Sequence, residues 1–482
     1  MLKNISAAAS RSITIICILL AASSSAQAQI RKPDGKTVTV TSIDHIVTDL
    51  MGKGEVTGLC LGIINENKPA YIKTYGYKNK QLHEKIDTAT CFYAASLAKP
   101  LFGYLVMQLA DRKIIDLDKP LYEYLPKPLP DYENYKDLAG DDRWKLITAR
   151  HCLSHTTGFP NWRAFTESKK LTIAFTPGKF YSYSGEGIEL LQMVIEIITG
   201  KKLEDLAQGN IFKPFGMRRT SFIWQPGFEN DYALGHDMNE DTITKSKRKE
   251  AHAAGSMETT IADYTRFISA VMQAERITQQ TKQEILSPQI KIKYNNWAFP
   301  PVEKDSIDDY NAIQLSYGLG WGLFNTNYGK AFFKEGHIDG WEHYSIGFPE
   351  KKIAYIIMTN SSNGESIFKE LVEKLTGVTI PWKWEGYFPY RETTKLTTAQ
   401  LQKFTGEFDG RLKVIITLVN GKLKVESPTV NLAKTNFYTA NDHHLFLKIM
   451  DANFDFVKGP DGRFDTIVAD DEGEHYELKR IK

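Results

Sequence analysis

Cysteine is scarce in this chain, with four among 482 residues. One of them, Cys17, lies in an apolar N-terminal stretch, and the other three are Cys60, Cys91 and Cys152. No two of the four have the C-x-x-C spacing of a zinc or redox motif, and three thiols allow at most one disulfide. The sequence therefore excludes a disulfide scaffold, and we expect the three cysteines to be buried thiols.

Long apolar runs are also lacking beyond the N-terminus, so no membrane span is expected. The N-terminus itself has basic residues at Lys3 and Arg11, an apolar run over 13–22, and the small-x-small site Ala26-Gln27-Ala28. This pattern is typical of a cleaved export signal. We predict a signal peptide over 1–28, a mature chain that starts at Gln29, and a periplasmic or secreted location.

Neither sign of charge is in excess, with 60 basic and 58 acidic residues. The predicted signal carries two of the basic residues and no acidic one, so the mature chain is balanced. Such a chain has no electrostatic reason to bind nucleic acid or another polyanion. The expected partner is a small-molecule or peptide substrate, and the sequence leaves the oligomeric state open.

Strand and helix patterns alternate through the first 380 residues. Apolar stretches separated by a polar turn predict strands at 58–64 and 70–76, and a second pair is expected at 344–348 and 352–359. Helical spacing of apolar residues, with glycines at two of the ends, predicts helices at 96–112, 189–199, 260–273 and 365–375. We expect a mixed α/β or α+β body over 29–379.

The composition changes near residue 380. Residues 380–395 are dense in proline and aromatics without periodicity, and we interpret them as a linker. Alternating apolar and polar residues follow, with Asn420-Gly421 as a type I′ hairpin signal. Residues 396–482 are therefore predicted to form a small all-β module.

Ser96 is the strongest candidate for a nucleophile. A lysine three residues later on a helix brings its amine to the serine hydroxyl, and Ser96-Leu97-Ala98-Lys99 has this spacing. An apolar stretch precedes Ser96 and an apolar helix follows it, so Lys99 is expected to be buried with a lowered pKa. The same spacing at Ser246 and Ser366 is interpreted as structural, because one lies in a charged run and the other starts a late amphipathic helix.

Several segments together resemble the class C β-lactamase-related family, which includes penicillin-binding D,D-peptidases, D-aminopeptidases and esterases. In the family's order, the matching segments lie at 92–99, 147–158, 177–184, 214–217, 255–263 and 317–321. The resemblance implies an α+β fold, an α/β sandwich in which an antiparallel sheet is flanked by helices, with an added helical subdomain. The module after 396 is similar to the barrel-like, lipocalin-like domain of some members.

The resemblance also implies a second catalytic residue, Tyr183. In the family the tyrosine of a Y-x-N motif accepts the serine proton, and nearby cations such as Lys99 favour its phenolate. Gly185 stands here where the family has asparagine. The departure puts in question a hydrogen bond to the substrate at Gly185, and not the chemistry of the tyrosine.

The family's third motif is a basic residue on the strand beside the nucleophile, and we match it to His337-Ile338-Asp339. The resemblance then implies an oxyanion hole from the backbone N–H groups of Ser96 and Gly340. The family usually has a hydroxyl residue second and glycine third. We expect Asp339 to place a carboxylate beside the site, to repel a substrate carboxylate, and to orient His337.

His151 and His155 have the spacing of a helical metal pair, but no glutamate lies between them and no third ligand is suggested nearby. We expect no metal and no cofactor.

The sequence thus predicts an exported serine hydrolase that cleaves an ester or amide through an acyl-enzyme on Ser96. Small esters, D-amino acid amides or peptides are the expected substrates. Two alternatives stay open. One is a β-lactamase or D,D-carboxypeptidase acting on β-lactams or peptidoglycan peptides. The other is a non-catalytic binding protein on a degenerate hydrolase scaffold.

Overall fold

The computed structural model describes residues 29–296, 298–302, 310–448, 452–460, 462–471 and 474–482. The predicted signal peptide, residues 1–28, lies outside the described residues. Within these ranges, no helix combines the length and the apolar character that crossing a membrane requires.

A nine-stranded sheet with antiparallel neighbours forms the centre of the body, in the order β10-β11-β12-β13-β14-β15-β3-β4-β5. Its strands are β3 (Gly58–Asn65), β4 (Lys68–Asn79), β5 (Glu84–Lys85), β10 (Ile290–Lys291), β11 (Ser316–Tyr317), β12 (Gly322–Thr326), β13 (Gly329–Ile338), β14 (Trp341–Phe348) and β15 (Ile353–Thr359). The N-terminal strands thus join the late strands through the β15–β3 pair. The two predicted strand pairs are confirmed as β3–β4 and β14–β15.

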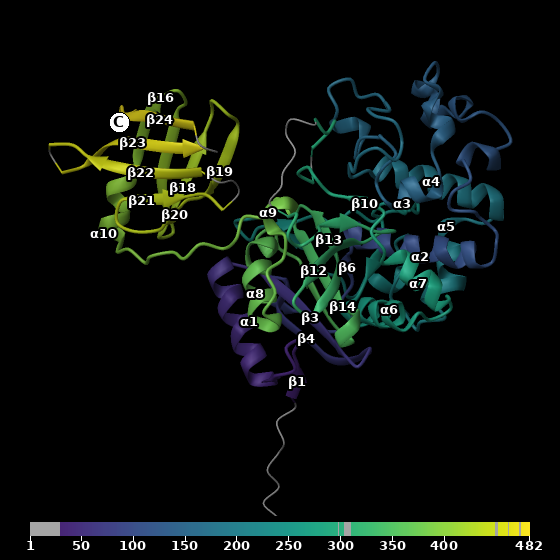
Figure 1. Ribbon diagram of the computed structural model, residues 1–482. Helices are drawn as coiled ribbons and strands as arrows, with labels where there is room; N and C mark the ends of the chain where they lie inside the picture. The colour runs from purple at the N-terminus through teal and green to yellow at the C-terminus, as the bar shows by residue number, and fades with distance from the viewer. Residues whose placement is uncertain (1–28, 297, 303–309, 449–451, 461, 472–473) are drawn as a thin grey trace, which may run out of the picture.

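Helices cover both faces of this sheet, as Figure 1 shows. Helices α1 (Val40–Gly54) and α8 (Phe368–Thr376) pack on one face, and α2 (Ala98–Asp111) and α6 (Ile261–Gln273) on the other. Strand β15 is buried on both sides, because Ile356 belongs to the core under α2 and α6 while Ile357 belongs to the core under α1 and α8. The predicted antiparallel sheet flanked by helices is confirmed.

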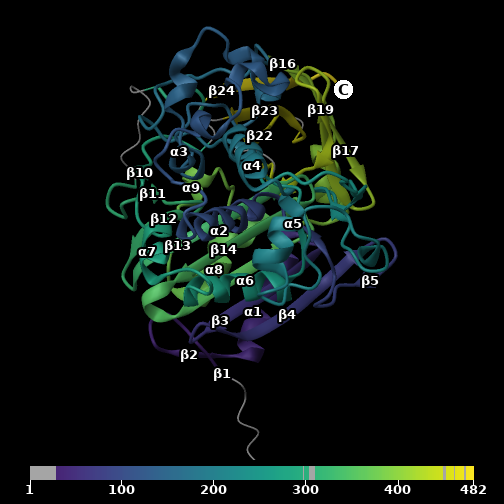
Figure 2. The same ribbon diagram turned by 90° about the vertical axis from the view of Figure 1, so that its right-hand side faces the viewer.

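A helical region extends the α2 side of the body. It contains α3 (Ala149–Leu153), α4 (Gly185–Thr199), α5 (Leu203–Ala207) and α7 (Gln279–Ile285), together with several short 3₁₀ turns. Figure 2 shows α2, α4 and α5 on this side of the molecule. Gly200 ends α4 in the left-handed conformation at φ +63°, as expected for a glycine C-cap.

The C-terminal module is a second nine-stranded antiparallel sheet, ordered β19-β18-β17-β16-β24-β23-β22-β21-β20. Its strands are β16 (Gly406–Gly410), β17 (Val414–Val419), β18 (Lys422–Ser427), β19 (Leu432–Asn436), β20 (Tyr438–Thr439), β21 (His444–Phe446), β22 (Ala452–Lys458), β23 (Phe464–Asp471) and β24 (Glu474–Arg480). The predicted turn at Asn420-Gly421 joins β17 to β18, with both residues at positive φ. Aromatic residues fill the interior, including Phe404, Phe456 and Phe464.

The segment interpreted as a linker differs from that prediction in its first half. Residues Ile380, Trp384 and Tyr387 are buried in the core under α1 and α8, and α9 (Trp382–Glu385) forms there. The indole N–H of Trp384 donates to the carbonyl oxygen of Tyr294 at 3.0 Å. These residues therefore belong to the body. Aromatic density without periodicity gave no signal of this, because the buried contacts are with distant segments.

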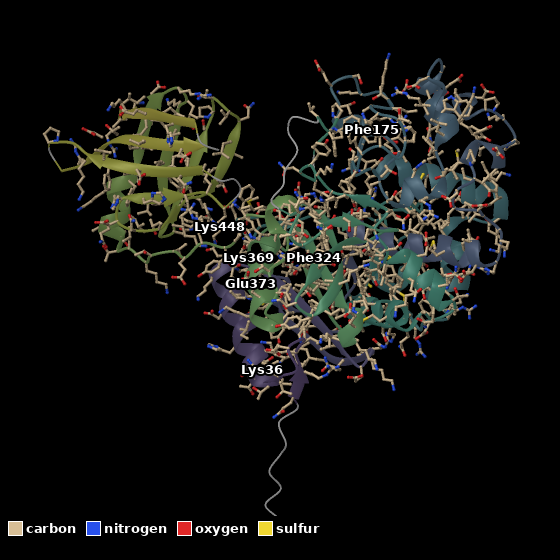
Figure 3. All side chains as sticks on the ribbon, in the orientation of Figure 1. Lys36, Phe175, Phe324, Lys369, Glu373 and Lys448 are labelled. Carbon is tan, nitrogen blue, oxygen red and sulfur yellow. The ribbon has the colours of Figure 1, made fainter. Side chains whose placement is uncertain are left out.

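The module also contacts the end of α1. The carboxylate of Glu55 accepts a hydrogen bond from Tyr438, and Lys422 and Lys448 lie 3.1 and 3.6 Å from it. In Figure 3, Lys448 lies on the side of the module that faces the body. Because these are polar contacts at the edge of two separate cores, each core is complete without the other.

A chain that ends at Arg391 is therefore expected to fold. It keeps α9 packed in the body and leaves only the Glu55 carboxylate without its partners, at a position that water can reach once the module is absent. Solubility and a cooperative thermal transition measure this. A matched truncation after Thr379 removes Trp384 and Tyr387 and should lose several kcal/mol, about 3–5 for each large aromatic. Aggregation of the longer form would show that the module completes the body.

Candidate active site

Ser96 lies in a strained turn that the sheet holds in place. Strand β6 (Phe92–Tyr93) pairs with β9 (Glu258–Thr259) and leads into the 3₁₀ turn Ala95–Leu97. Ala95 has φ +46°, in the left-handed region that residues with a Cβ rarely adopt. Such strain concentrates at functional sites, and here it presents the half-buried Ser96 to a pocket.

Lys99 stands one helical turn later with its ammonium directed back at the serine. Its Nζ donates to Ser96 Oγ at 2.8 Å and to the carbonyl oxygen of Ala254 at 2.6 Å. The side chain is 2% exposed. Burial lowers the pKa of Lys99, the Tyr183 phenol opposes this, and the nearby Lys334 cation lowers it further. The predicted burial and lowered pKa are present.

Tyr183 lies between two ammonium groups. Lys99 Nζ is 4.9 Å and Lys334 Nζ is 4.8 Å from the centroid of its ring. Burial raises the pKa of the phenol, but Lys334, Lys99 and a hydrogen bond with Ser96 outweigh this and leave the pKa below its usual value. Because a lowered pKa makes the phenolate accessible near neutral pH, Tyr183 is suited to accept the serine proton.

Lys334 is the functional residue that sequence reasoning missed. It is fully buried, and its ammonium contacts the Glu335 carboxylate. Burial lowers the pKa of Lys334, but Glu335 and Tyr183 outweigh this and raise it. Lys334 is therefore a stable cation at neutral pH, beside the phenol whose charge it favours.

The glycine after this pair explains how the strand approaches the nucleophile. A Cβ added at Gly336 would lie 2.8 Å from the carbonyl oxygen of Ala94. Strand β13 can therefore lie against the nucleophile turn only with glycine at this position. The triplet Lys334-Glu335-Gly336 has a basic residue first and glycine third, which is the signal that could have placed the motif three residues earlier than His337.

The side chain of His337 is engaged elsewhere. Its Nδ1 lies 2.6 Å from Glu365 Oε1 and 2.7 Å from Glu342 Oε2. Burial opposes the charge, but Glu342 and Glu365 raise the pKa of His337 to about 11. These two carboxylates, not Asp339, hold the ring. The basic residue beside Tyr183 is thus Lys334, because the expected alternation was counted from the wrong starting residue.

Two further predicted residues have different surroundings. The Gly340 N–H donates to Ser362 Oγ at 2.8 Å, so this donor already has a partner in the structure. Asp339 lines the same pocket as Ser96.

The missing amide at Gly185 has a steric cause. A Cβ at Gly185 would lie 2.6 Å from the ring of Trp162. The Gly185 N–H donates to Asn161, to its backbone oxygen at 3.0 Å and to its Oδ1 at 3.1 Å. Trp162 and Asn161 thus occupy the space that a longer side chain at Gly185 would need, and both line the pocket.

His151 and His155 support the surrounding loops. His151 Nδ1 accepts from the Thr148 N–H at 3.3 Å, and His155 Nδ1 accepts from the Ser184 N–H at 3.2 Å. The His155 ring packs 4.3 Å from that of Tyr183, and burial together with Lys99 and Lys334 holds its pKa well below the usual range. His155 is therefore a neutral residue that positions the Tyr183 segment.

One cluster among the described residues has the donor types of a metal site, namely His337, Glu342 and Glu365. The imidazole nitrogen lies 2.6 and 2.7 Å from the two carboxylates. Ligand atoms around a tetrahedral zinc, at bond lengths near 2.0 Å, are separated by about 3.3 Å. The observed contacts are the shorter ones of charge-assisted hydrogen bonds.

The pocket that holds Ser96 has a volume of about 520 Å³. It is lined by Tyr93, Ala95, Ser96, Lys99, Asn161, Trp162, Phe165, Tyr183, Ala254, Gly255, Glu335, His337, Ile338 and Asp339. A serine bonded to a buried lysine, with a tyrosine of lowered pKa beside them, is the arrangement of an enzyme that forms an acyl-serine intermediate.

The chain belongs to the beta-lactamase family, whose model matches residues 43–375. Penicillin-binding protein 4* of Bacillus subtilis is 22% identical over 456 residues, which cover 86% of this chain and 92% of that protein. The octameric penicillin-binding protein homologue from Pyrococcus abyssi superposes with a TM-score of 0.58 at 18% identity, over 92% of this chain and 100% of that one. The D-alanine carboxypeptidase AmpC from Burkholderia cenocepacia gives 0.53 at 19% identity, over 67% and 93%. The protein is a hydrolase of the serine type.

Proposed function

We propose that the protein is an exported serine hydrolase that cleaves a small ester or amide through an acyl-enzyme on Ser96. The observation that carries this proposal is the 2.8 Å contact of Lys99 Nζ with Ser96 Oγ, beside a tyrosine held between two ammonium groups. Export rests on the N-terminal signal pattern.

In the proposed reaction, Ser96 Oγ attacks the substrate carbonyl carbon while its proton passes to Tyr183. The bond to the leaving group then breaks, and Tyr183 returns the proton to the departing nitrogen or oxygen. Water, deprotonated by the same group, releases the acid and restores Ser96. Lys334 and Lys99 stabilise the phenolate between these steps.

The backbone N–H of Ser96 is one proposed donor to the oxyanion. In the family the second donor follows the basic triplet. With Lys334-Glu335-Gly336 as the triplet, that donor is the His337 N–H, which replaces Gly340 in this role because the Gly340 N–H donates to Ser362.

The proposal is tested by incubating the protein with a fluorophosphonate and with a panel of neutral esters, D-amino acid amides, penicillins and peptides ending in D-alanine. Mass spectrometry of the intact protein identifies acyl adducts. Turnover of esters or amides with poor turnover of carboxylate-bearing compounds is expected, because Asp339 and Glu335 both line the pocket. Efficient penicillin hydrolysis would instead support a β-lactamase, and the absence of any adduct would support a binding protein.

Lys99 and Tyr183 should behave as one proton-transfer unit. Lys99→Ala and Tyr183→Phe are each expected to lower kcat/KM by about 10²–10⁴, since each removes general base catalysis. The double variant should lose little more than the worse single variant. Single-turnover acylation rates for the four proteins measure the coupling. Losses that add fully in free energy would show that the two residues act independently.

A further inference from the structure

Glu335 presents an unsatisfied oxygen in the active-site pocket. The residue lines the pocket and is 7% exposed. Its Oε1 accepts a hydrogen bond from Lys334 Nζ. Its Oε2 is buried and has no hydrogen-bond partner among the described residues. One half of the carboxylate is thus bound within the protein and the other half is open for a ligand.

A buried carboxylate oxygen without a donor is costly, since removing water from it is not offset by a hydrogen bond. The basic side chains of the pocket do not supply one: Lys99 donates to Ser96 and Ala254, and His337 contacts Glu342 and Glu365. Asp339, the other carboxylate in the wall, adds to the negative charge. The complementary group is therefore a cation with an N–H.

We propose that Glu335 binds a protonated amine on the leaving group of the substrate, so that the enzyme prefers esters or amides whose leaving group is cationic. This inference rests on the proposed acylation of Ser96. It commits to the leaving group because Glu335 is second in the basic triplet, where the family offers a hydroxyl to the carboxylate of a departing D-alanine. A glutamate there reverses the charge that the position recognises.

The aromatic wall is compatible with this ligand. Trp162 and Phe165 line the pocket, and Phe165 is 80% exposed. Aromatic faces attract ammonium groups and do not attract carboxylates. An amine that enters past these rings therefore meets favourable surfaces before it reaches Glu335.

Three hippuryl thioesters with leaving groups of equal or similar size test the proposal. The thiols are 2-(dimethylamino)ethanethiol, whose protonated amine has one N–H, its neutral isostere 3-methylbutane-1-thiol, and mercaptoacetate, which carries a carboxylate. In each reaction the Ser96 Oγ–carbonyl bond forms, the carbonyl–sulfur bond breaks, the proton goes to the thiolate, and water then frees hippurate. Released thiol is measured at neutral pH.

The intact protein is expected to prefer the ammonium thioester over its neutral isostere by about tenfold or more in kcat/KM, with the carboxylate thioester the poorest. Glu335→Gln should reduce the preference to within about twofold while the rate with the neutral thioester stays within about threefold, since glutamine keeps a side-chain oxygen for Lys334. Glu335→Asp should restore part of the preference. Asp339→Asn removes the other pocket carboxylate and should retain most of it.

Equal or greater activity on the neutral or carboxylate thioester in the intact protein would overturn the inference, provided that a fluorophosphonate still labels Ser96. A preference that survives in Glu335→Gln, or that disappears in Asp339→Asn, would overturn it as well and assign the charge recognition to Asp339. Absence of both labelling and thiol release would reject the proposed function itself, which separates the two failures.

Discussion

Replacing Ser96 with alanine is expected to abolish covalent labelling by a fluorophosphonate and to lower kcat/KM by at least about 10⁴. The loss is large because no other hydroxyl in the described residues combines a strained turn, a 2.8 Å contact with a buried lysine, and a place in the pocket. Without the hydroxyl, Lys99 and Tyr183 have no proton to remove. Intact-mass and peptide mass spectrometry measure the label.

Ser366→Ala and Ser246→Ala are the matched controls, since both serines have a lysine three residues later. In the structure, Ser366 Oγ donates to the Asn363 carbonyl oxygen at 2.7 Å, and Lys369 pairs with Glu373 at 3.1 Å. These contacts are those of a helix start and a surface ion pair, so both controls should label like the intact protein. Label that persists in Ser96→Ala, or that is lost in a control, would move the nucleophile.

Local patterns were sufficient to predict the elements that hold the nucleophile. Strands β3, β4, β14 and β15 have apolar runs or alternation between turn residues, and helices α2, α4, α6 and α8 have clear periodicity. The type I′ turn at Asn420-Gly421 also followed from residue types alone. The spacing of Ser96 and Lys99 is a helical one, so the distance between them was fixed once the helix was recognised.

The register of β13 was less accessible to sequence reasoning. Residues 334–338 alternate, but nothing local says which side chain reaches Tyr183, which lies about 150 residues earlier in the chain. A buried lysine is rare and is recognisable only through its partners, here Glu335 and Tyr183. The constraint that decides the register is steric, since Gly336 must lie against Ala94. Buried contacts of the 380–387 segment were inaccessible for the same reason.

This assignment makes Lys334→Met the second variant with a large expected effect. Its cation lies 4.8 Å from the Tyr183 ring and is the largest of the influences that lower the pKa of the phenol. Removing it raises the pKa of Tyr183, so less phenolate is present at neutral pH. A loss of about 10²–10³ in kcat/KM is expected, with the acidic limb of its pH profile moved to higher pH and part of the rate recovered there.

Two comparisons separate this effect from a folding defect. Lys334→Met alone leaves the buried Glu335 carboxylate unpaired, so the double variant with Glu335→Gln, which removes both charges, should regain thermal stability but not the rate. His337→Ala removes the imidazole that the earlier match of the motif would make catalytic, and it should cost less than about tenfold because its ring contacts Glu342 and Glu365 and not Tyr183. A larger loss for His337→Ala than for Lys334→Met, or an unmoved acidic limb in Lys334→Met, would return the catalytic cation to His337 and shift the basic triplet back by three residues.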